Sequence, residues 1–196
     1  MTSTPTVVAV SGSLRDGSYT RTALMYVLEA AEQAGAETRL LDLQEYDLPV
    51  YDPDLEGQGE SETVTRIVRE ADAVVLGSPV YHGSYSGVLK NFHDYCTFEE
   101  YEKTIVGLLA TAGGGSYGPT LEHLRSTVRG VHGWVLPHQV GIPDAYEQFE
   151  EDPEAPDGRR FVDPDLEARV EKLGRQLVAY AEIEPASNAE AAAADD

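Results

Sequence analysis

Hydroxyl groups, glycines and one arginine stand together in a short segment near the start of the chain. Residues 11–21 read Ser-Gly-Ser-Leu-Arg-Asp-Gly-Ser-Tyr-Thr-Arg, between the apolar run 7–10 and a segment of helical periodicity. Exposed amides at a helix N-terminus, together with the helix dipole, favour a bound phosphate. The side chains that can donate to that phosphate are Ser13, Ser18, Thr20 and Arg15. The segment therefore predicts a phosphate site, with a plain turn capped by serines as the alternative.

The glycine spacing in this segment excludes two common nucleotide motifs. Gly12 and Gly17 lack the spacing of the dinucleotide fingerprint, and the lysine of a nucleoside-triphosphate P-loop is missing. A loop of this size suits a mononucleotide.

A second loop, 78–91, could hold a planar ring. Pro79 stiffens its start, Tyr81 offers an amphipathic wall, and Gly83 lets the backbone approach a ring closely. The alternative for Tyr81 and Tyr85 is ordinary core or surface packing.

A third loop, 111–118, contains three consecutive glycines at 113–115, which also permit close approach of the backbone. Its alternative is a flexible turn.

Apolar runs alternate with segments of helical periodicity along the chain. The runs that predict strands cover 7–10, 37–41, 73–76, 104–110 and 133–136. The segments that predict helices cover 20–33, 60–70, 87–95, 120–129 and 165–182. Continuous apolar strands alternating with helices predict a doubly wound parallel α/β sheet with helices on both faces. Because such sheets bind ligands beyond the carboxyl ends of their strands, the loops after the first, third and fourth strands are the expected site.

An acidic excursion, 144–163, follows the fifth expected strand and shows no clear period. It is long for a connection, and it leaves the edge of the sheet where ligands bind. Its apolar anchors and basic pair are Tyr146, Phe149, Phe161, Arg159 and Arg160. We expect the excursion to border the active site, where the arginines could meet a nucleotide phosphate or carboxylates of a neighbouring subunit. A solvated acidic loop is an equal alternative.

The composition limits the class of partner. The chain has 196 residues and a formal net charge of −21. That charge argues against nucleic acid, and it indicates a protein adapted to a salt-rich cytoplasm, because salt screens the repulsion. The length predicts one domain over 1–184 with a low-complexity, disordered tail at 185–196. No segment suits a signal peptide or a membrane span, so we expect a soluble cytoplasmic protein.

Metal and covalent chemistry find little support in the sequence. No metal-ligand spacing is found among the histidines, which are His82, His93, His123, His132 and His138. The single cysteine, Cys96, is expected to be a packed thiol. No Gly-x-Ser-x-Gly elbow surrounds a serine, so a serine hydrolase is not expected.

Motifs in the first two loops resemble those of a known family. They are Gly12-Ser13-Leu14-Arg15, Ser18, Ser78-Pro79, Tyr81, Gly83-Ser84 and Gly87-Val88-Leu89-Lys90-Asn91. Over about residues 6–136 the chain resembles the NADPH-dependent FMN reductases of the flavodoxin-like superfamily, whose relatives reduce azo dyes, chromate and quinones. The resemblance implies a flavodoxin-like five-stranded sheet of order 2-1-3-4-5, bound FMN, NADPH or NADH as co-substrate, and a homodimer or homotetramer.

The resemblance places the FMN phosphate in the first loop and the isoalloxazine between the second and third. The implied FMN contacts are Ser11, Ser13, Arg15, Ser18, Tyr19, Thr20, Pro79, Val80, Tyr81, His82, Gly83, Ser84, Ala112, Gly113, Gly114 and Tyr117. No catalytic side chain is obligatory, because the flavin does the chemistry. Tyr81 and His82 are the side chains expected to line the acceptor pocket.

Three positions depart from the family pattern. Thr20 stands where the family commonly has asparagine, and Ser86 replaces a usual proline. Pro79-Val80-Tyr81-His82 stands where the family often has Pro-Glu-Tyr-Asn. These departures bear on the electron acceptor and the nucleotide preference more than on flavin binding.

The implied activity is hydride transfer from NAD(P)H through FMN to a small acceptor, such as free flavin, a quinone, an azo compound or a metal oxyanion. One alternative is a flavodoxin-like electron carrier without NAD(P)H turnover; Arg15 speaks against it, because flavodoxins proper have no arginine in this loop. The other is a scaffold that has lost its flavin.

Overall fold

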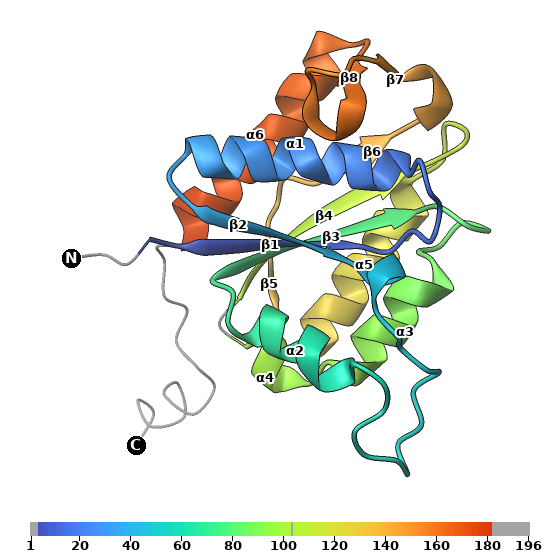
Figure 1. Cartoon of the computed structure of the whole chain (residues 1–196), viewed down its shortest axis with the longest axis vertical. Helices are drawn as coiled ribbons and strands as arrows, with labels where there is room; N and C mark the ends of the chain where they lie inside the picture. Colours follow the sequence, from blue (N-terminus) through green and yellow to red (C-terminus); the bar gives the residue numbers. More distant parts are fainter. Residues whose placement is uncertain (1–3, 103, 182–196) are drawn as a thin grey trace.

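The computed structural model describes residues 4–102 and 104–181, which form one parallel sheet with helices on both faces (Figure 1). The strands are β1 (Thr6–Ser11), β2 (Glu37–Asp42), β3 (Ala73–Pro79), β4 (Ile105–Thr111), β5 (Trp134–Val135) and β6 (Val140–Ile142). The central strands β1, β3 and β4 are apolar runs buried along nearly their whole length, because helices cover both faces. The predicted α/β class is confirmed.

The strand order is β2-β1-β3-β4-β5, with every neighbouring pair parallel. The chain runs from β1 outward to β2 and then returns to β3 on the other side of β1. This order is the flavodoxin-like one, as the sequence predicted. Ligands of such sheets lie beyond the carboxyl ends of β1 and β3, where the order reverses.

The fifth position of the sheet is built from two short strands. β5 pairs with the start of β4, and β6 pairs with its end, from Leu109 to Thr111. Pro137 lies between them and has no N–H to donate to the ladder. The sequence predicted only the first of these pieces, at 133–136. The second extends the sheet beside the end of β4 where the ligand is expected.

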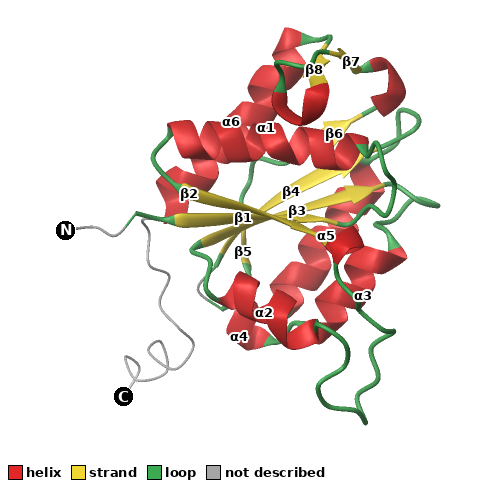
Figure 2. Ribbon diagram, viewed as in Figure 1, coloured by secondary structure: helices red, strands yellow, loops and turns green. Residues whose placement is uncertain are grey.

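The two faces of the sheet are covered by different numbers of helices (Figure 2). On one face lie α1 (Tyr19–Gln33) and α6 (Pro164–Ala181), and on the other lie α2 (Ser61–Arg69), α3 (Gly87–Tyr95) and α5 (Gly118–Gly130). Gly174 lets α6 approach α1, since a Cβ there would lie 2.2 Å from the carbonyl oxygen of Val27. These helices begin and end within two residues of the predicted bounds.

The excursion 144–163 corrects one expectation. Instead of an irregular loop it contains an antiparallel hairpin of β7 (Phe149–Glu151) and β8 (Arg159–Phe161), with the 3₁₀ turns η2 (Ala145–Glu147) and η3 (Pro156–Gly158). Three-residue strands are too short to show an alternating pattern. Ring contacts hold them: the Phe149 and Phe161 centroids are 4.4 Å apart, and those of Tyr26 and Phe161 are 4.9 Å apart.

Two further short elements were not predicted, η1 (Leu43–Glu45) and α4 (Phe98–Tyr101). The tail 185–196, expected to be disordered, lies outside the described residues. Within the part of the chain that is described, no helix is both long and apolar enough to cross a membrane.

Candidate functional site

A cavity of about 260 Å³ lies at the carboxyl ends of β1, β3 and β4. Its walls come from the three loops that the sequence singled out and from the start of the excursion. The lining residues are Ser13, Arg15, Ser18, Tyr19, Thr20, Pro79, Val80, Tyr81, Thr111, Ala112, Gly113, Ala145 and Tyr146. The fold therefore brings most of the suggested residues to one place.

The first loop wraps the N-terminal end of α1. Gly17 makes the turn with a φ of +51°, which glycine adopts without strain. Ser18 is the N-cap, and its Oγ accepts the amide N–H of Arg21 at 3.2 Å. The Oγ of Ser13 accepts the amide N–H of Arg15 at 3.3 Å. The loop is thus fixed around a helix end whose dipole favours an anion, with the Arg15 side chain exposed at the cavity.

Two buried serines tie the first loop to the second. The Oγ of Ser86 donates to the carbonyl oxygen of Gly12 at 2.6 Å and also accepts the amide N–H of Leu89 at 3.1 Å, which caps α3. The Oγ of Ser78 accepts the amide N–H of Ser86 at 2.9 Å. A Cβ on Gly12 would lie 2.7 Å from the Cβ of Leu89, so only glycine allows this approach. Ser86 therefore positions the site.

The second loop places Pro79, Val80 and Tyr81 on the cavity wall. Tyr81 and Ser84 exchange backbone hydrogen bonds of 2.9 and 3.1 Å, which close a two-residue turn at His82 and Gly83. These two residues have φ values of +50° and +77°. Such a turn favours glycine, asparagine or aspartate, and histidine tolerates the left-handed conformation better than most residues. His82 consequently stands at the tip of the turn, off the cavity wall.

The third loop begins at Thr111, the last residue of β4. Its Oγ1 lies 2.5 Å from the Oγ1 of Thr20, joining the end of β4 to the first turn of α1. Thr20 is almost fully buried, and its hydroxyl is engaged by Thr111. A Cβ on Gly113 would meet no protein atom within 4 Å. This glycine keeps the wall open to a flat group.

The start of the excursion closes the cavity. The amide of Ala145 donates to the carbonyl oxygen of Ala112 at 2.9 Å, and the amide of Asp144 donates to that of Gly114 at 3.3 Å. Tyr146 follows on the cavity wall and is exposed. A hydrogen bond with Glu147 raises the pKa of the Tyr146 phenol.

Six of the suggested residues do not line the cavity, namely Ser11, His82, Gly83, Ser84, Gly114 and Tyr117. Ser11 is fully buried at the end of β1, Ser84 contacts His123 at 3.0 Å, and Tyr117 packs against Gly141. Thr111 and Ala145 line the cavity although the sequence did not suggest them. No local sequence pattern marks either residue. Both reach the cavity because β6 pairs with the end of β4.

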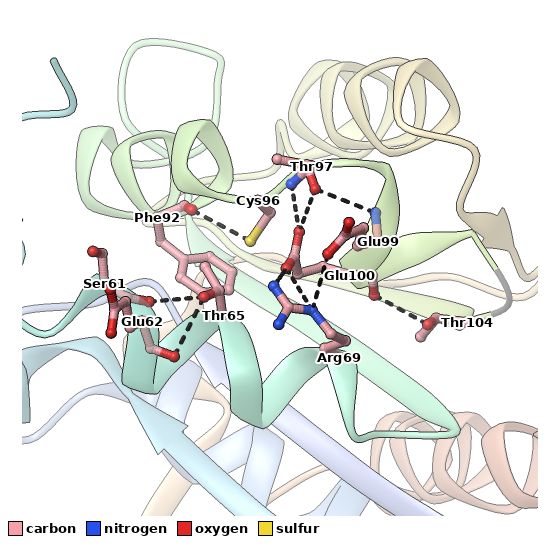
Figure 3. A network of polar contacts seen from close by, with 10 residues as sticks. All are labelled: Ser61, Glu62, Thr65, Arg69, Phe92, Cys96, Thr97, Glu99, Glu100 and Thr104. Carbon is pink, nitrogen blue, oxygen red and sulfur yellow. Dashed lines mark hydrogen bonds and ion pairs between the residues drawn. The ribbon is translucent and has the colours of Figure 1, made fainter. Parts of the chain in front are cut away.

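The other candidate groups lie outside this site. Cys96 belongs to a polar network between α2, α3 and α4, on the face of the sheet opposite α1 and α6 (Figure 3). It is 6% exposed, and burial raises the pKa of its thiol, so the prediction of a packed thiol is confirmed. Among residues 4–102 and 104–181, no group of three or more His, Cys, Asp or Glu side chains is placed to hold a metal ion.

The two ends of the cavity differ in chemistry. One end carries hydroxyl donors and a cation, from Ser13, Ser18 and Arg15, beside the positive end of a helix dipole. The other end is lined by the apolar segment 79–81 and by the open backbone at Gly113. A mononucleotide with a phosphate and a flat heterocycle, such as FMN, fits both ends.

Fold and cavity together define a flavodoxin-like protein. The structure matches that of an NADH:FMN oxidoreductase in its apo form with a TM-score of 0.73 and 17% identity, covering 95% of this chain and 94% of the other. It matches an NAD(P)H:acceptor flavoenzyme from Paracoccus denitrificans with a TM-score of 0.72 and 24% identity, covering 92% and 98% of the two chains. At these identities the likeness concerns the fold alone.

Sequence comparison identifies the family. The model of the NADPH-dependent FMN reductase family matches residues 5–147. An FMN-dependent NADPH-azoreductase of Staphylococcus haemolyticus is 32% identical over 189 residues, 90% of this chain and 95% of the relative. An NADPH azoreductase of Bacillus sp. strain OY1-2 is 36% identical over 146 residues, 72% and 79% of the two chains. The chain belongs to the NADPH-dependent FMN reductase family, and it is an NAD(P)H-dependent oxidoreductase with FMN as its flavin.

Proposed function

We propose that the cavity at the ends of β1, β3 and β4 is the FMN site, and that a small planar aromatic acceptor is reduced there. The observation that carries the proposal is the division of one cavity into a cationic, hydroxyl-bearing end and an apolar end, at the point where the strand order reverses. Arg15, Ser13 and Ser18 bind the phosphate. Their role matters because a chain of net charge −21 otherwise repels an anion.

FMN held in this cavity would supply the redox chemistry, which is hydride uptake from the reduced nicotinamide and electron transfer to the acceptor. The residues of the chain orient the reactants and exclude water. Pro79, Val80 and Ala112 present an apolar wall to the ring, and Gly113 leaves room for it. Tyr81 closes the apolar end, and the exposed turn at His82 and Gly83 follows it outside the cavity wall.

Two tyrosines support an aromatic acceptor. Tyr81 and Tyr146 line the same cavity from separate loops, and they are 54% and 57% exposed. Exposed rings beside a flat cofactor favour a flat partner, because stacked aromatic pairs gain energy beyond their buried area. The relatives named azoreductases agree with an azo compound as acceptor.

The test of the proposed function is spectroscopic. We expect the purified protein to be yellow, to release FMN rather than FAD on denaturation, and to be bleached by anaerobic NADPH. Release of FAD, or protein that stays colourless after incubation with FMN, would contradict the proposal. Protein that binds FMN but does not oxidise NADPH with any acceptor would be an electron carrier.

The phosphate end can be tested by Arg15→Ala. Loss of a charge-assisted hydrogen bond costs about 1.5–3 kcal/mol, so we expect the affinity for FMN in a fluorescence titration to fall by roughly ten- to a hundredfold. Unchanged affinity would show that Arg15 is not a phosphate ligand.

We further propose a homodimer or homotetramer that completes the active site. The loop after η1 exposes Val50 and Leu55, by 86% and 59%. It is nevertheless held to α3, because Asn91 Oδ1 accepts the amide N–H of Tyr51 at 2.9 Å. A fixed loop with exposed apolar side chains is typical of an interaction surface. A fully active monomer in light scattering would refute the proposal.

We also propose a salt-rich cytoplasm as the working environment. The support is the charge of −21, which salt screens, and the dependence of the reaction on a pool of reduced nicotinamide nucleotide. We expect the melting temperature to rise between dilute buffer and molar KCl. A melting temperature indifferent to salt would remove the halophilic interpretation.

A further inference from the structure

The hairpin of β7 and β8 is pinned to the N-terminal half of α1, above which it lies in Figure 1. The carboxylate of Asp157 accepts hydrogen bonds from the Nε of Arg21 at 3.1 Å and from the Oγ1 of Thr22 at 2.8 Å. The hydroxyl of Tyr26 donates to the carbonyl oxygen of Arg159 at 3.0 Å. The match to the family model ends at residue 147, so the hairpin lies outside the matched residues.

This anchoring brings one side chain of the hairpin to the phosphate loop. The guanidinium carbon of Arg159 lies 5.3 Å from the ring centroid of Tyr19, which lines the cavity. Its Nη2 lies 3.1 Å from the position that a Cβ on Gly17 would take. Gly17 directly precedes Ser18, the N-cap of α1. Arg159 is therefore held against the turn that leads into the helix end.

The neighbouring arginines are neutralised, and Arg159 is not. Arg21 pairs with Asp157 at 2.5 Å and lies 3.8 Å from Asp42. Arg160, the next residue in the strand, pairs with carboxylates of its own hairpin, Glu150 and Asp152. Within residues 4–102 and 104–181, no carboxylate forms an ion pair with Arg159. Its guanidinium instead makes a cation–π contact with the Tyr19 ring. In so acidic a chain, a cation without a carboxylate partner is available to an anionic ligand.

We propose that Arg159 is a second cation beside the first loop, next to the site of Arg15, and that it binds a phosphate monoester there. The inference rests on the proposed function, which puts a nucleotide phosphate there. The monoester is either the 5′-phosphate of FMN or the 2′-phosphate of NADPH, and both present the same dianion to a guanidinium. The anchored backbone at residues 157–159 lowers the conformational entropy lost when the side chain binds.

The experiment compares FMN with riboflavin, which lacks the phosphate. We expect Arg159→Ala to raise the Kd for FMN about tenfold and to leave the Kd for riboflavin unchanged, as measured by flavin fluorescence on apoprotein. Arg159→Lys should recover part of the loss. The matched control is Arg160→Ala, which removes an adjacent arginine already paired within the hairpin and should change neither Kd. Thermal melts of each variant show whether it is folded.

The second arm distinguishes the two sources of phosphate. An unchanged Kd for FMN in Arg159→Ala, with a KM that rises for NADPH but not for NADH, would assign Arg159 to the 2′-phosphate. The proposal is overturned if Arg159→Ala changes neither the Kd for FMN nor the KM for NADPH. It is also overturned if the variant raises the Kd for FMN and for riboflavin equally, because the side chain would then only support the loop. Failure of the wild-type protein to bind FMN would instead overturn the proposed function itself.

Discussion

Two arginine clusters lie on opposite faces of the sheet and differ in how their charge is compensated. Between α2 and α4, Arg69 donates through Nε to Glu100 at 3.1 Å (Figure 3). The second oxygen of Glu100 accepts the amide and the hydroxyl of Thr97 at 2.6 and 2.9 Å. Glu100 is 1% exposed, and each oxygen of this buried carboxylate has a hydrogen-bond partner. Beside α1, by contrast, the Arg159 guanidinium lies over the Tyr19 ring and next to Gly17, and it has no ion pair with a carboxylate among residues 4–102 and 104–181.

This difference in charge compensation distinguishes an ion pair that stabilises the fold from an arginine that can bind a ligand. A buried carboxylate with every oxygen paired leaves nothing for a ligand, and removing either partner is costly. An arginine held in place without a carboxylate keeps its charge for an anion that arrives from solvent. The cluster beside α1 contains an arginine of each kind. Asp157 forms an ion pair with Arg21, whereas it forms none with Arg159.

The largest effect on stability is expected for Glu100→Ala. It leaves Arg69 and the amide of Thr97 without their acceptor, and it should lower the free energy of unfolding by about 3 kcal/mol in urea denaturation. The affinity for FMN should not change, because no residue of this cluster lines the cavity. The control is Glu99→Ala, which removes an exposed carboxylate 3.7 Å from Arg69 and should cost well under about 1 kcal/mol.

Cys96 reports on the same substitution. Burial and then the Glu100 carboxylate raise the pKa of its thiol. Glu100→Ala removes the charge and loosens the packing, so alkylation of Cys96 should become faster than in the wild-type protein. Equal alkylation rates and equal stability would show that the network of Figure 3 neither holds Cys96 in place nor stabilises the fold.

Asp157→Ala should cost less than Glu100→Ala, about 2 kcal/mol of unfolding free energy. Asp157 holds the hairpin to Arg21 and Thr22, but the Arg21 side chain is 38% exposed and can turn to water. Glu150→Ala, which breaks the exposed pair with Arg160, is the control and should cost well under 1 kcal/mol. A larger loss for Asp157→Ala than for Glu100→Ala would reverse the order of the two clusters.

The sequence predicted the sheet and the three loops because their signals are local. The strands β1, β3 and β4 are long apolar runs, and residues 11–21 carry their serines, glycines and arginine in one stretch. The hairpin could not be found in this way, since its strands are three residues long and are held by the Tyr19 and Tyr26 rings of α1. The Asp157-Gly158 pair was one available turn signal.

The residues that close the cavity depend on register rather than on local pattern. Ala145 reaches the site because β6 pairs with the end of β4, and Thr111 because it lies across from the first turn of α1. Ser86 counted in the sequence only as a departure from a motif. Its bond to Gly12 spans 74 positions of the chain, and no spacing rule reveals it.

Ser86→Ala tests whether the two regions are independent. Ser86 begins α3, and the other end of that helix carries the cluster around Cys96. Loss of the N-cap and of the bond to Gly12 should cost about 1.5 kcal/mol of stability. Because Gly12 belongs to the phosphate loop, the affinity for FMN should fall severalfold, while alkylation of Cys96 stays at the wild-type rate. Ser84→Ala, on the exposed side of the same loop, should change neither quantity.

The smallest effect is expected for Tyr26→Phe, which removes one hydroxyl from the support of Arg159 and keeps the ring contact with Phe161. A neutral hydrogen bond contributes about 1 kcal/mol, so the variant should be slightly less stable at neutral pH. Burial raises the pKa of Tyr26 to about 12, above that of a tyrosine in the unfolded chain. The unfolded wild-type chain therefore loses this proton before the folded protein does, and the stability advantage of the wild type should shrink as the pH rises from 10 to 12. Urea denaturation of both proteins across that range measures the difference. A constant difference would mean that the Tyr26 hydroxyl is not buried against the carbonyl of Arg159, and that the hairpin is held by its rings and Asp157 alone.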